Sequence, residues 1–331
     1  MGSPPAGPGA RPGPAGDLTG EQPEQVLEGE AAREALQQAG RSTTSRRDLS
    51  RSPAFRTVSP ELGRLDETAF EQALADDPDA VLALLADMAG ATDEGLRRLA
   101  RRLAGRVAVR LGVTGPVRER GTGRLRRVPL APGGDLDVDA SLDALLHAEA
   151  SGALPAAEDL RATEWGRASV ALCLLVDRSG SVGGERLASA ALAAAAVALR
   201  APDDHSVLAF SDQVVVLRGQ AEPRPVEEVV GALLQLRGHG TTDLHLALET
   251  AGRQLARSSA ARKVVVLLSD GRPTTGPDPL PAARALDELL VVAPGDDAEQ
   301  ARALAVAAGA RFEELRGPSD VPRALRVLAG P

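Results

Sequence analysis

The feature that most constrains the fold is an unbroken apolar run, residues 170–176, which ends at the acidic residue Asp177. The run shows no helical stripe, and continuous apolar residues are typical of a strand buried on both faces of a parallel sheet. Asp177-Arg-Ser-Gly-Ser181 follows, with oxygen-bearing side chains at alternate positions and Gly180 permitting a tight bend. Open α/β sheets bind ligands at the carboxyl ends of their strands, and hard cations take oxygen ligands. This loop therefore predicts a divalent-cation site.

The second half of the chain, from about residue 168, alternates predicted strands with predicted helices. Besides the first apolar run, strands are expected at 206–210, 214–217, 263–269, 289–292 and 310–315. Helices are expected at 186–200, 225–236, 243–255 and 297–308, with a closing helix from 319. Residues 214–217 follow a short turn and indicate an antiparallel edge strand. The alternation predicts an α/β fold, with a mostly parallel sheet and helices on both faces.

Two further loops belong with the first one. Thr241 and Thr242 stand just before a predicted helix, and Asp270 follows the second fully apolar strand. If the two apolar strands are neighbours, Asp177 and Asp270 lie at the same edge of the sheet. The three loops offer oxygen donors and no cysteine, which disfavours soft metals and favours Mg²⁺.

These three motifs, in this order and on these elements, resemble the von Willebrand factor A domain, a Rossmann-like fold. The resemblance covers residues 166–331 and implies a metal-ion-dependent adhesion site that holds Mg²⁺ or Mn²⁺. The residues it implies for the metal all carry oxygen side chains: Asp177, Ser179, Ser181, Thr242 and, through water, Asp270. Thr241 is the alternative to Thr242, which the family pattern favours because it immediately precedes Asp243.

A finer resemblance concerns the subgroup. The C-terminal position of this domain, behind a basic helical region, is similar to bacterial relatives of the D subunit of magnesium and cobalt chelatases. It is also similar to the proteins that work beside MoxR-type AAA+ ATPases. In those systems the domain is an adaptor whose metal binds an Asp or Glu of a protein partner, while the ATPase supplies the work. The sequence has no Walker motif, so this chain itself is expected to be a non-catalytic adaptor.

The first half of the chain divides into two predicted regions. Residues 1–55 are rich in Pro, Gly, Ser and charge, which predicts a mostly disordered arm with one helix around 22–38. Residues 56–165 carry apolar residues at helical spacing and predict a small helical module.

Opposite charges follow one another within the helical module. Between Arg97 and Arg127 there are eleven arginines and one glutamate, which could hold RNA, a phosphate or an acidic partner. The favoured alternative is a solvated helix face followed by a basic loop, because aromatic residues make up only 2% of the chain. The acidic segment from Asp135 to Asp143 lacks the glycine and final glutamate of a calcium loop. It predicts a capped helix start that pairs with the basic segment.

Composition and charge limit which functions and cellular locations are expected. The formal charge of −8 argues against bulk attraction to nucleic acid. Cys173 is the only cysteine, so no disulfide can form within the chain, and a buried thiol in a reducing compartment is expected. Neither a leader peptide nor a membrane span is apparent, and a cytoplasmic location without membrane attachment is expected.

Two enzyme classes are alternatives to the adaptor. In a Mg²⁺-dependent hydrolase, Ser179 or Ser181 would be the nucleophile, and His239 or His245 would be the only nearby base. An orienting acid for that histidine is not evident. A dinucleotide-binding domain is disfavoured, because the Gly-x-Gly-x-x-Gly turn is missing after the first strand.

Overall fold

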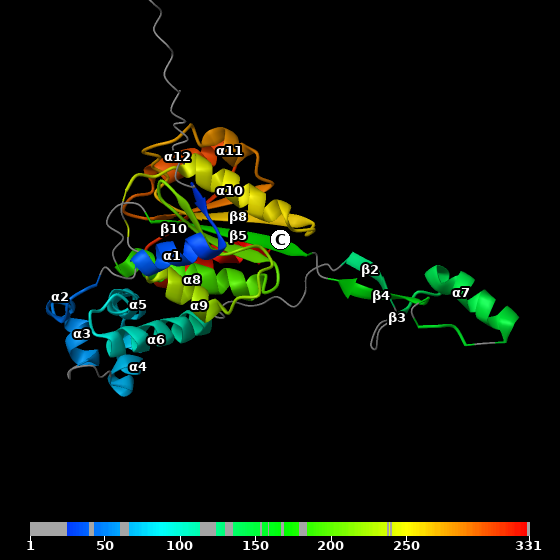
Figure 1. Ribbon diagram of the computed structural model, residues 1–331, viewed down its shortest axis with the longest axis horizontal. Helices are drawn as coiled ribbons and strands as arrows, with labels where there is room; N and C mark the ends of the chain where they lie inside the picture. Colours follow the sequence, from blue (N-terminus) through cyan, green and yellow to red (C-terminus); the bar gives the residue numbers. More distant parts are fainter. Residues whose placement is uncertain are drawn as a thin grey trace, which may run out of the picture.

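The computed structural model describes residues 25–39, 43–59, 66–112, 124–129, 135–152, 154–157, 159–166, 169–178, 184–236, 238 and 240–329. A seven-stranded sheet with helices on both faces forms its centre, and a three-stranded sheet with one helix stands to the side (Figure 1). No helix in these ranges is both long and apolar enough to cross a bilayer.

The central sheet has the strand order β1-β7-β6-β5-β8-β9-β10. Its strands are β1 (Val26–Leu27), β5 (Val170–Asp177), β6 (His205–Phe210), β7 (Val214–Arg218), β8 (Arg262–Leu268), β9 (Glu288–Pro294) and β10 (Arg311–Leu315). Neighbours run parallel except β6 and β7, which confirms the mostly parallel sheet. The two apolar strands β5 and β8 are direct neighbours, with Val176 opposite Leu268. The prediction that β7 is an edge strand is wrong, because β1 pairs along its outer side.

Each face of the sheet packs into its own apolar core. Successive side chains of β5 point to opposite faces, so β5 contributes to both cores. Leu172, Leu174 and Val176 join one core, whereas Ala171, Cys173 and Leu175 join the other. The second core is covered by α10 (Leu244–Ala256), α11 (Leu280–Arg284) and α12 (Glu299–Ala308). The first is covered by α8 (Gly184–Arg200), α9 (Val226–Leu233) and the short elements η1 (Pro318–Asp320), α13 (Val321–Ala324) and η2 (Leu325–Ala329). Both faces are therefore removed from water, as the continuous apolar strands require.

Helix α8 is buried on all sides. Every residue from Leu187 to Val197 is buried, because α5 (Pro78–Met88) and α6 (Glu94–Gly112) pack on the side that faces away from the sheet. They belong to a helical layer, residues 46–112, with α2 (Arg46–Leu49), α3 (Pro53–Val58) and α4 (Glu67–Asp76). The small alanine side chains of α8 let a sheet and a helix pair approach it from opposite sides. The helical layer consequently shares one apolar core with the sheet.

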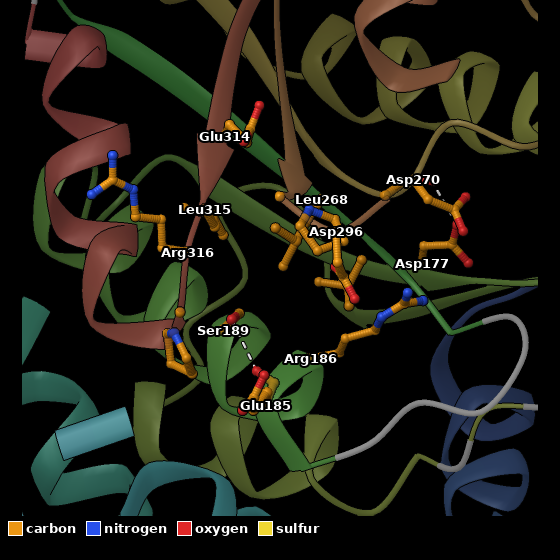
Figure 2. A pocket seen from close by; sticks show the side chains of 16 residues that line it. Asp177, Glu185, Arg186, Ser189, Leu268, Asp270, Asp296, Glu314, Leu315 and Arg316 are labelled. Atoms are coloured by element: carbon orange, nitrogen blue, oxygen red, sulfur yellow. Dashed lines mark hydrogen bonds between the residues drawn. The ribbon is translucent and has the colours of Figure 1, made fainter. Parts of the chain in front are cut away.

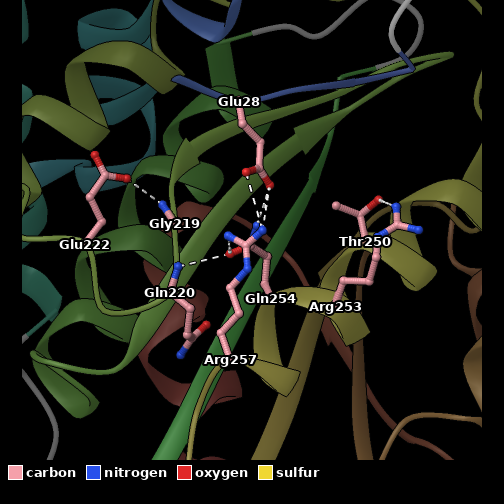
Figure 3. Close-up of polar contacts among 8 residues, drawn as sticks. All are labelled: Glu28, Gly219, Gln220, Glu222, Thr250, Arg253, Gln254 and Arg257. Carbon is pink, nitrogen blue, oxygen red and sulfur yellow. Dashed lines mark hydrogen bonds and ion pairs between the residues drawn. The ribbon is translucent and has the colours of Figure 1, made fainter. Parts of the chain in front are cut away.

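The first described residues are bound to the same domain, although the sequence predicted a mostly disordered arm up to residue 55. β1 pairs with β7, and α1 (Gly29–Ala39) follows it and buries Ala32 and Leu36. Glu28 accepts a hydrogen bond from Gln254 (2.8 Å) and pairs with Arg257 at 3.4 Å (Figure 3). A two-residue strand is too short to show a periodic pattern, which is why the sequence did not indicate it.

A side unit, residues 124–166, contains the basic and acidic segments. It consists of β2 (Arg124–Pro129), β3 (Asp135–Leu136), α7 (Val138–Ser151) and β4 (Arg161–Gly166), with strand order β2-β4-β3. Residues 124–129 are a strand rather than the expected loop. β4 lies between the two charged strands, so that Arg127 and Asp135 both stand opposite Thr163. The capped helix start is confirmed, since the Asp137 carboxylate accepts a hydrogen bond from the Ala140 N–H at 3.0 Å.

Candidate metal centre

The candidate site lies at the carboxyl edge of the central sheet, where β5 and β8 end side by side. The chain order reverses here: β6 and β7 extend the sheet in one direction from β5, and β8, β9 and β10 extend it in the other. Such a switch point is where open α/β sheets bind ligands. Asp177 is the last residue of β5, and Asp270 comes two residues after the end of β8. Their carboxylates face each other in Figure 2.

Ser269 orients the Asp177 carboxylate. Its hydroxyl donates a 2.6 Å hydrogen bond to Asp177 Oδ2 and accepts one from the Gly271 N–H at 2.9 Å. Gly271 has φ +75°, and a side chain there would meet the backbone of Ala301 at 2.6 Å. Ser269 is not among the residues predicted for the site, although its place between an apolar strand and an acid could have indicated it.

The surroundings of Asp270 disfavour the charged form of its carboxyl group. Partial burial raises the pKa of its carboxyl, and the nearby charges of Asp177 and Asp297 raise it further. The Arg272 N–H donates to Asp270 Oδ1 at 3.0 Å and acts in the opposite direction. A cation between the two carboxylates would relieve this repulsion.

The Thr241–Thr242 loop is held at the same edge. Asp243 donates its N–H to the Ser211 carbonyl at 2.8 Å, just beyond β6, and its carboxylate caps α10 through the Leu246 N–H at 2.9 Å. The Thr242 N–H donates to Thr274 Oγ1 at 2.7 Å. Thr242 is buried and Thr241 is exposed, so the two predicted alternatives differ in environment. Which of them binds metal stays a prediction.

The remaining predicted residues lie outside the described ranges. These are Ser179 and Ser181, and also His239 of the hydrolase alternative. The flanking chain is described: Arg178 is buried and donates its N–H to the Phe210 carbonyl at 2.9 Å, and α8 begins at Gly184. His245 is the other candidate base.

Both ring nitrogens of His245, in α10, have polar neighbours. Its Nδ1 lies 2.8 Å from the Asp278 carbonyl, and its Nε2 lies 3.4 Å from Glu249 Oε1. Both ring nitrogens are therefore engaged, and the ring has no described contact with the Asp177 edge. This arrangement does not favour His245 as a general base.

A pocket of about 530 Å³ opens beside the two carboxylates (Figure 2). Its apolar lining includes Val176, Leu268 and Leu315 from the ends of β5, β8 and β10. Glu185 and Arg186 from the first turn of α8 contribute charged groups. The pocket adjoins the candidate metal centre and forms a concave surface next to it.

The donor set fits a hard divalent cation. Oxygen atoms from carboxylates and hydroxyls suit Mg²⁺ or Mn²⁺ better than softer metals. Within the described ranges, no three or more His, Cys, Asp and Glu residues gather as they would for a metal held by such groups alone. The acidic segment from Asp135 to Asp143, part of which is α7, forms no such cluster either. The edge with Asp177 and Asp270 therefore remains the best-supported place for a cation.

Comparison with known proteins agrees with this architecture. Residues 171–314 match the family model of the von Willebrand factor type A domain. This part of the chain is a von Willebrand factor A domain. No functionally curated protein matches the chain.

Among solved structures with similarity to this von Willebrand factor A domain are three from different sources. A von Willebrand factor type A protein from Catenulispora acidiphila is 19% identical, with a TM-score of 0.41, over 50% of this chain and 43% of its own. Manganese-loaded TRAP protein from Plasmodium vivax is 18% identical, with a TM-score of 0.39, over 49% and 74%. The pilus tip protein Mfa5 from Porphyromonas gingivalis is 12% identical, with a TM-score of 0.40, over 49% and 94%. The chain spans less than half of the first protein, and these likenesses carry no conclusion about what it binds.

Proposed function

We propose that this chain is a metal-dependent adaptor that binds an Asp or Glu of a protein partner through Mg²⁺ or Mn²⁺. The observation that carries the proposal is the convergence of Asp177 and Asp270 at the switch point of a von Willebrand factor A domain. Asp177, Ser179, Ser181 and Thr242 would hold the cation, and Asp270 would act through water. The chain would act without catalysis of its own, in the cytoplasm.

The chemistry of these residues explains why a partner carboxylate would be attracted. Mg²⁺ takes about six oxygen ligands, and this chain offers only a few of them, most of which are neutral hydroxyls. The cation therefore keeps positive charge toward an incoming anion. Ser269 holds Asp177 in place, so the metal edge is organised before the partner arrives.

The partner that we propose is a MoxR-type or chelatase-type AAA+ ATPase. The sequence resemblance supports this choice, since the von Willebrand factor A domain lies behind a basic helical region. The helical layer packs directly on α8, whose first turn borders the metal edge. A partner could therefore contact the layer and the metal edge together.

Calorimetric titration of Mg²⁺ and Mn²⁺ tests the metal centre directly. Asp177→Ala should abolish binding and leave the far-UV circular dichroism spectrum unchanged, because the carboxylate lies at the sheet edge. Asp296→Ala is the matched control, since Asp296 lines the same pocket but is not a predicted ligand. Thr242→Ala should weaken binding more than Thr241→Ala. Unchanged affinity in Asp177→Ala would refute the site.

Partner binding tests the adaptor role. Capture of a purified MoxR-type ATPase on the full chain should require Mg²⁺ or Mn²⁺, disappear with chelator and fail with Asp177→Ala. Replacing the partner's acidic residue should cause the same loss, and combining both changes should add little. Capture that persists in chelator would mean that another surface makes the contact.

A second candidate, binding of RNA or an acidic partner, is favoured by one observation on α6. Arg98, Arg102, Arg106 and Arg110 recur every four residues and are all exposed. Arg98 and Arg110 pair with Glu94 and Glu71, at 4.0 and 3.1 Å. Steeply salt-dependent RNA binding that is lost in a double Arg102→Gln, Arg106→Gln variant would support this candidate.

A further inference from the structure

The side unit exposes most of the large apolar side chains that the described chain leaves uncovered. Seven such residues are exposed in the described ranges, and five of them lie between residues 136 and 154. The five are Leu136, Val138, Leu142, Leu146 and Leu154, with exposed fractions of 41, 56, 48, 53 and 94%. Scattered exposed leucines are ordinary, but a concentration of this kind in one small unit marks an interaction surface.

Helix α7 contacts β4 and exposes three of its four large apolar side chains, whereas Leu145 is half-buried. Ser141 and Ala148 are the residues that it buries. Ser141 Oγ accepts a 2.9 Å hydrogen bond from the Arg161 N–H and donates one to the Arg161 carbonyl at 3.2 Å, which fastens α7 to β4. A helix in a water-soluble domain normally has the reverse arrangement, with its apolar stripe against the core.

The outward apolar residues form a continuous stripe. Val138, Leu142 and Leu146 are spaced by four residues, so they lie one above the other on the same face of the helix. This is the spacing of the anchors that an amphipathic helix inserts into a partner's groove. We call these three residues the α7 stripe.

Negative charge flanks the α7 stripe and indicates the chemistry of its partner. Asp139, Asp143 and Glu149 are exposed on α7, and Asp135 is exposed at the preceding strand. In a two-fold contact between two copies, the same acids would face each other across the interface. A partner with lysine or arginine at the rim of its apolar surface would complement them.

We propose that the α7 stripe is a docking surface for a second protein, one that offers an apolar groove or helix face rimmed by lysine and arginine. The stripe lies in the side unit, whereas the candidate metal edge lies on the central sheet (Figure 1). The chain is then an adaptor with two separate contacts, one through metal and one through α7. Binding at the stripe needs no metal.

A designed peptide tests the proposal on the full chain. The probe is a fluorescein-labelled helical peptide with leucines on one face, lysines beside them and no tryptophan. It should bind in fluorescence anisotropy, more weakly at high salt and equally well with chelator. A matched peptide with glutamate in place of lysine should not bind. A double Leu142→Ser, Leu146→Ser variant should lose roughly a hundredfold in affinity, since each buried leucine contributes on the order of a tenfold factor.

The chain supplies its own controls. Leu199→Ser and Val306→Ser remove exposed apolar side chains outside the side unit and should leave peptide binding unchanged. Unchanged far-UV circular dichroism and an unchanged urea midpoint should report that the variants keep the fold. Equal binding of both peptides, or unchanged binding by the leucine variant, would overturn the proposal. So would concentration-dependent self-association in sedimentation that the leucine variant abolishes, since the occupant would then be a second copy.

Discussion

Helices α5 and α7 have similar sequences and opposite surroundings. Both begin after an aspartate cap and carry adjacent leucines, Leu84 and Leu85 in α5, Leu145 and Leu146 in α7. Leu84 and Leu85 are 4 and 1% exposed, whereas Leu146 is 53% exposed. The difference comes from the neighbouring elements. α5 packs on α8 within the main core, whereas α7 contacts β4 of a three-stranded sheet that stands aside (Figure 1).

This comparison shows that apolar content does not decide whether a helix stabilises the domain or binds a partner. The helical layer contributes some of the most buried side chains of the described chain, including Phe55, Met88 and Leu96. Helix α7 of the side unit, by contrast, buries Ser141 and Ala148 and leaves larger apolar residues in water. The layer should therefore unfold together with the von Willebrand factor A domain, and the side unit should not.

The largest expected effect comes from Leu85→Ala in α5. Removing a fully buried leucine side chain should lower the free energy of unfolding by about 3–4 kcal/mol, through lost burial and the cavity left behind. Urea unfolding followed by circular dichroism should show the main transition, which the sheet and the helical layer share, at a lower midpoint. The matched change Leu146→Ala in α7 should shift it by less than about 0.5 kcal/mol. A separate early transition for the layer would contradict the shared core.

Lowering the pH should reduce the stability of the central domain more than that of the side unit, because of His205. Burial, together with the charge of Arg218, lowers the pKa of His205 to about 4, and its Nδ1 lies 2.6 Å from the Ala201 carbonyl. The unfolded chain has a histidine pKa of about 6.5, so it binds the proton more readily than the folded one. Stability should therefore fall as pH decreases from about 6.5 to about 4, by up to about 3 kcal/mol in total.

The measurement is urea unfolding at a series of pH values, followed in parallel by circular dichroism and by Trp165 emission. His205→Asn keeps an N–H donor without the titration, and its stability should depend less on pH in this range. The Trp165 transition, which reports on the side unit, should move less than the main one. Identical shifts in both signals would show that the side unit and the core unfold as one.

The smallest expected effects come from two glycine-to-alanine changes, which should alter the free energy of unfolding in opposite directions. Gly184 opens α8 against α5, and a side chain there would meet the Ala83 carbonyl oxygen at 2.5 Å. Gly184→Ala should cost about 1–2 kcal/mol, because backbone must move. Gly231 in α9 borders open space, and a methyl group added there would meet nothing within 4 Å apart from its chain neighbours and the backbone of its own helix. Gly231→Ala should therefore stabilise by about 0.5–1 kcal/mol. Thermal unfolding of both variants checks the signs, and destabilisation by both would contradict the reasoning.

The elements nearest the candidate metal centre were predictable from the sequence. An apolar run of seven residues that ends at Asp177 can only be satisfied by burial on both faces, and a second such run ends near Asp270. That these two strands are neighbours was a condition of the prediction, and the structure fulfils it. The helix N-caps at Asp137 and Asp243 were also predictable, because each cap involves residues only three positions apart in the sequence.

What the sequence could not determine depends on contacts between distant segments. β1 joins the edge of β7 from almost two hundred residues away in the chain, and Ser269 acquires its role only because β8 lies beside β5. The alanine pattern of α8 predicts a closely packed helix but does not identify α5 and α6 as its second cover. The leucines of α5 and α7 are alike in sequence, and only the tertiary structure decides which are buried, because burial depends on the neighbouring surface and not on the side chain itself.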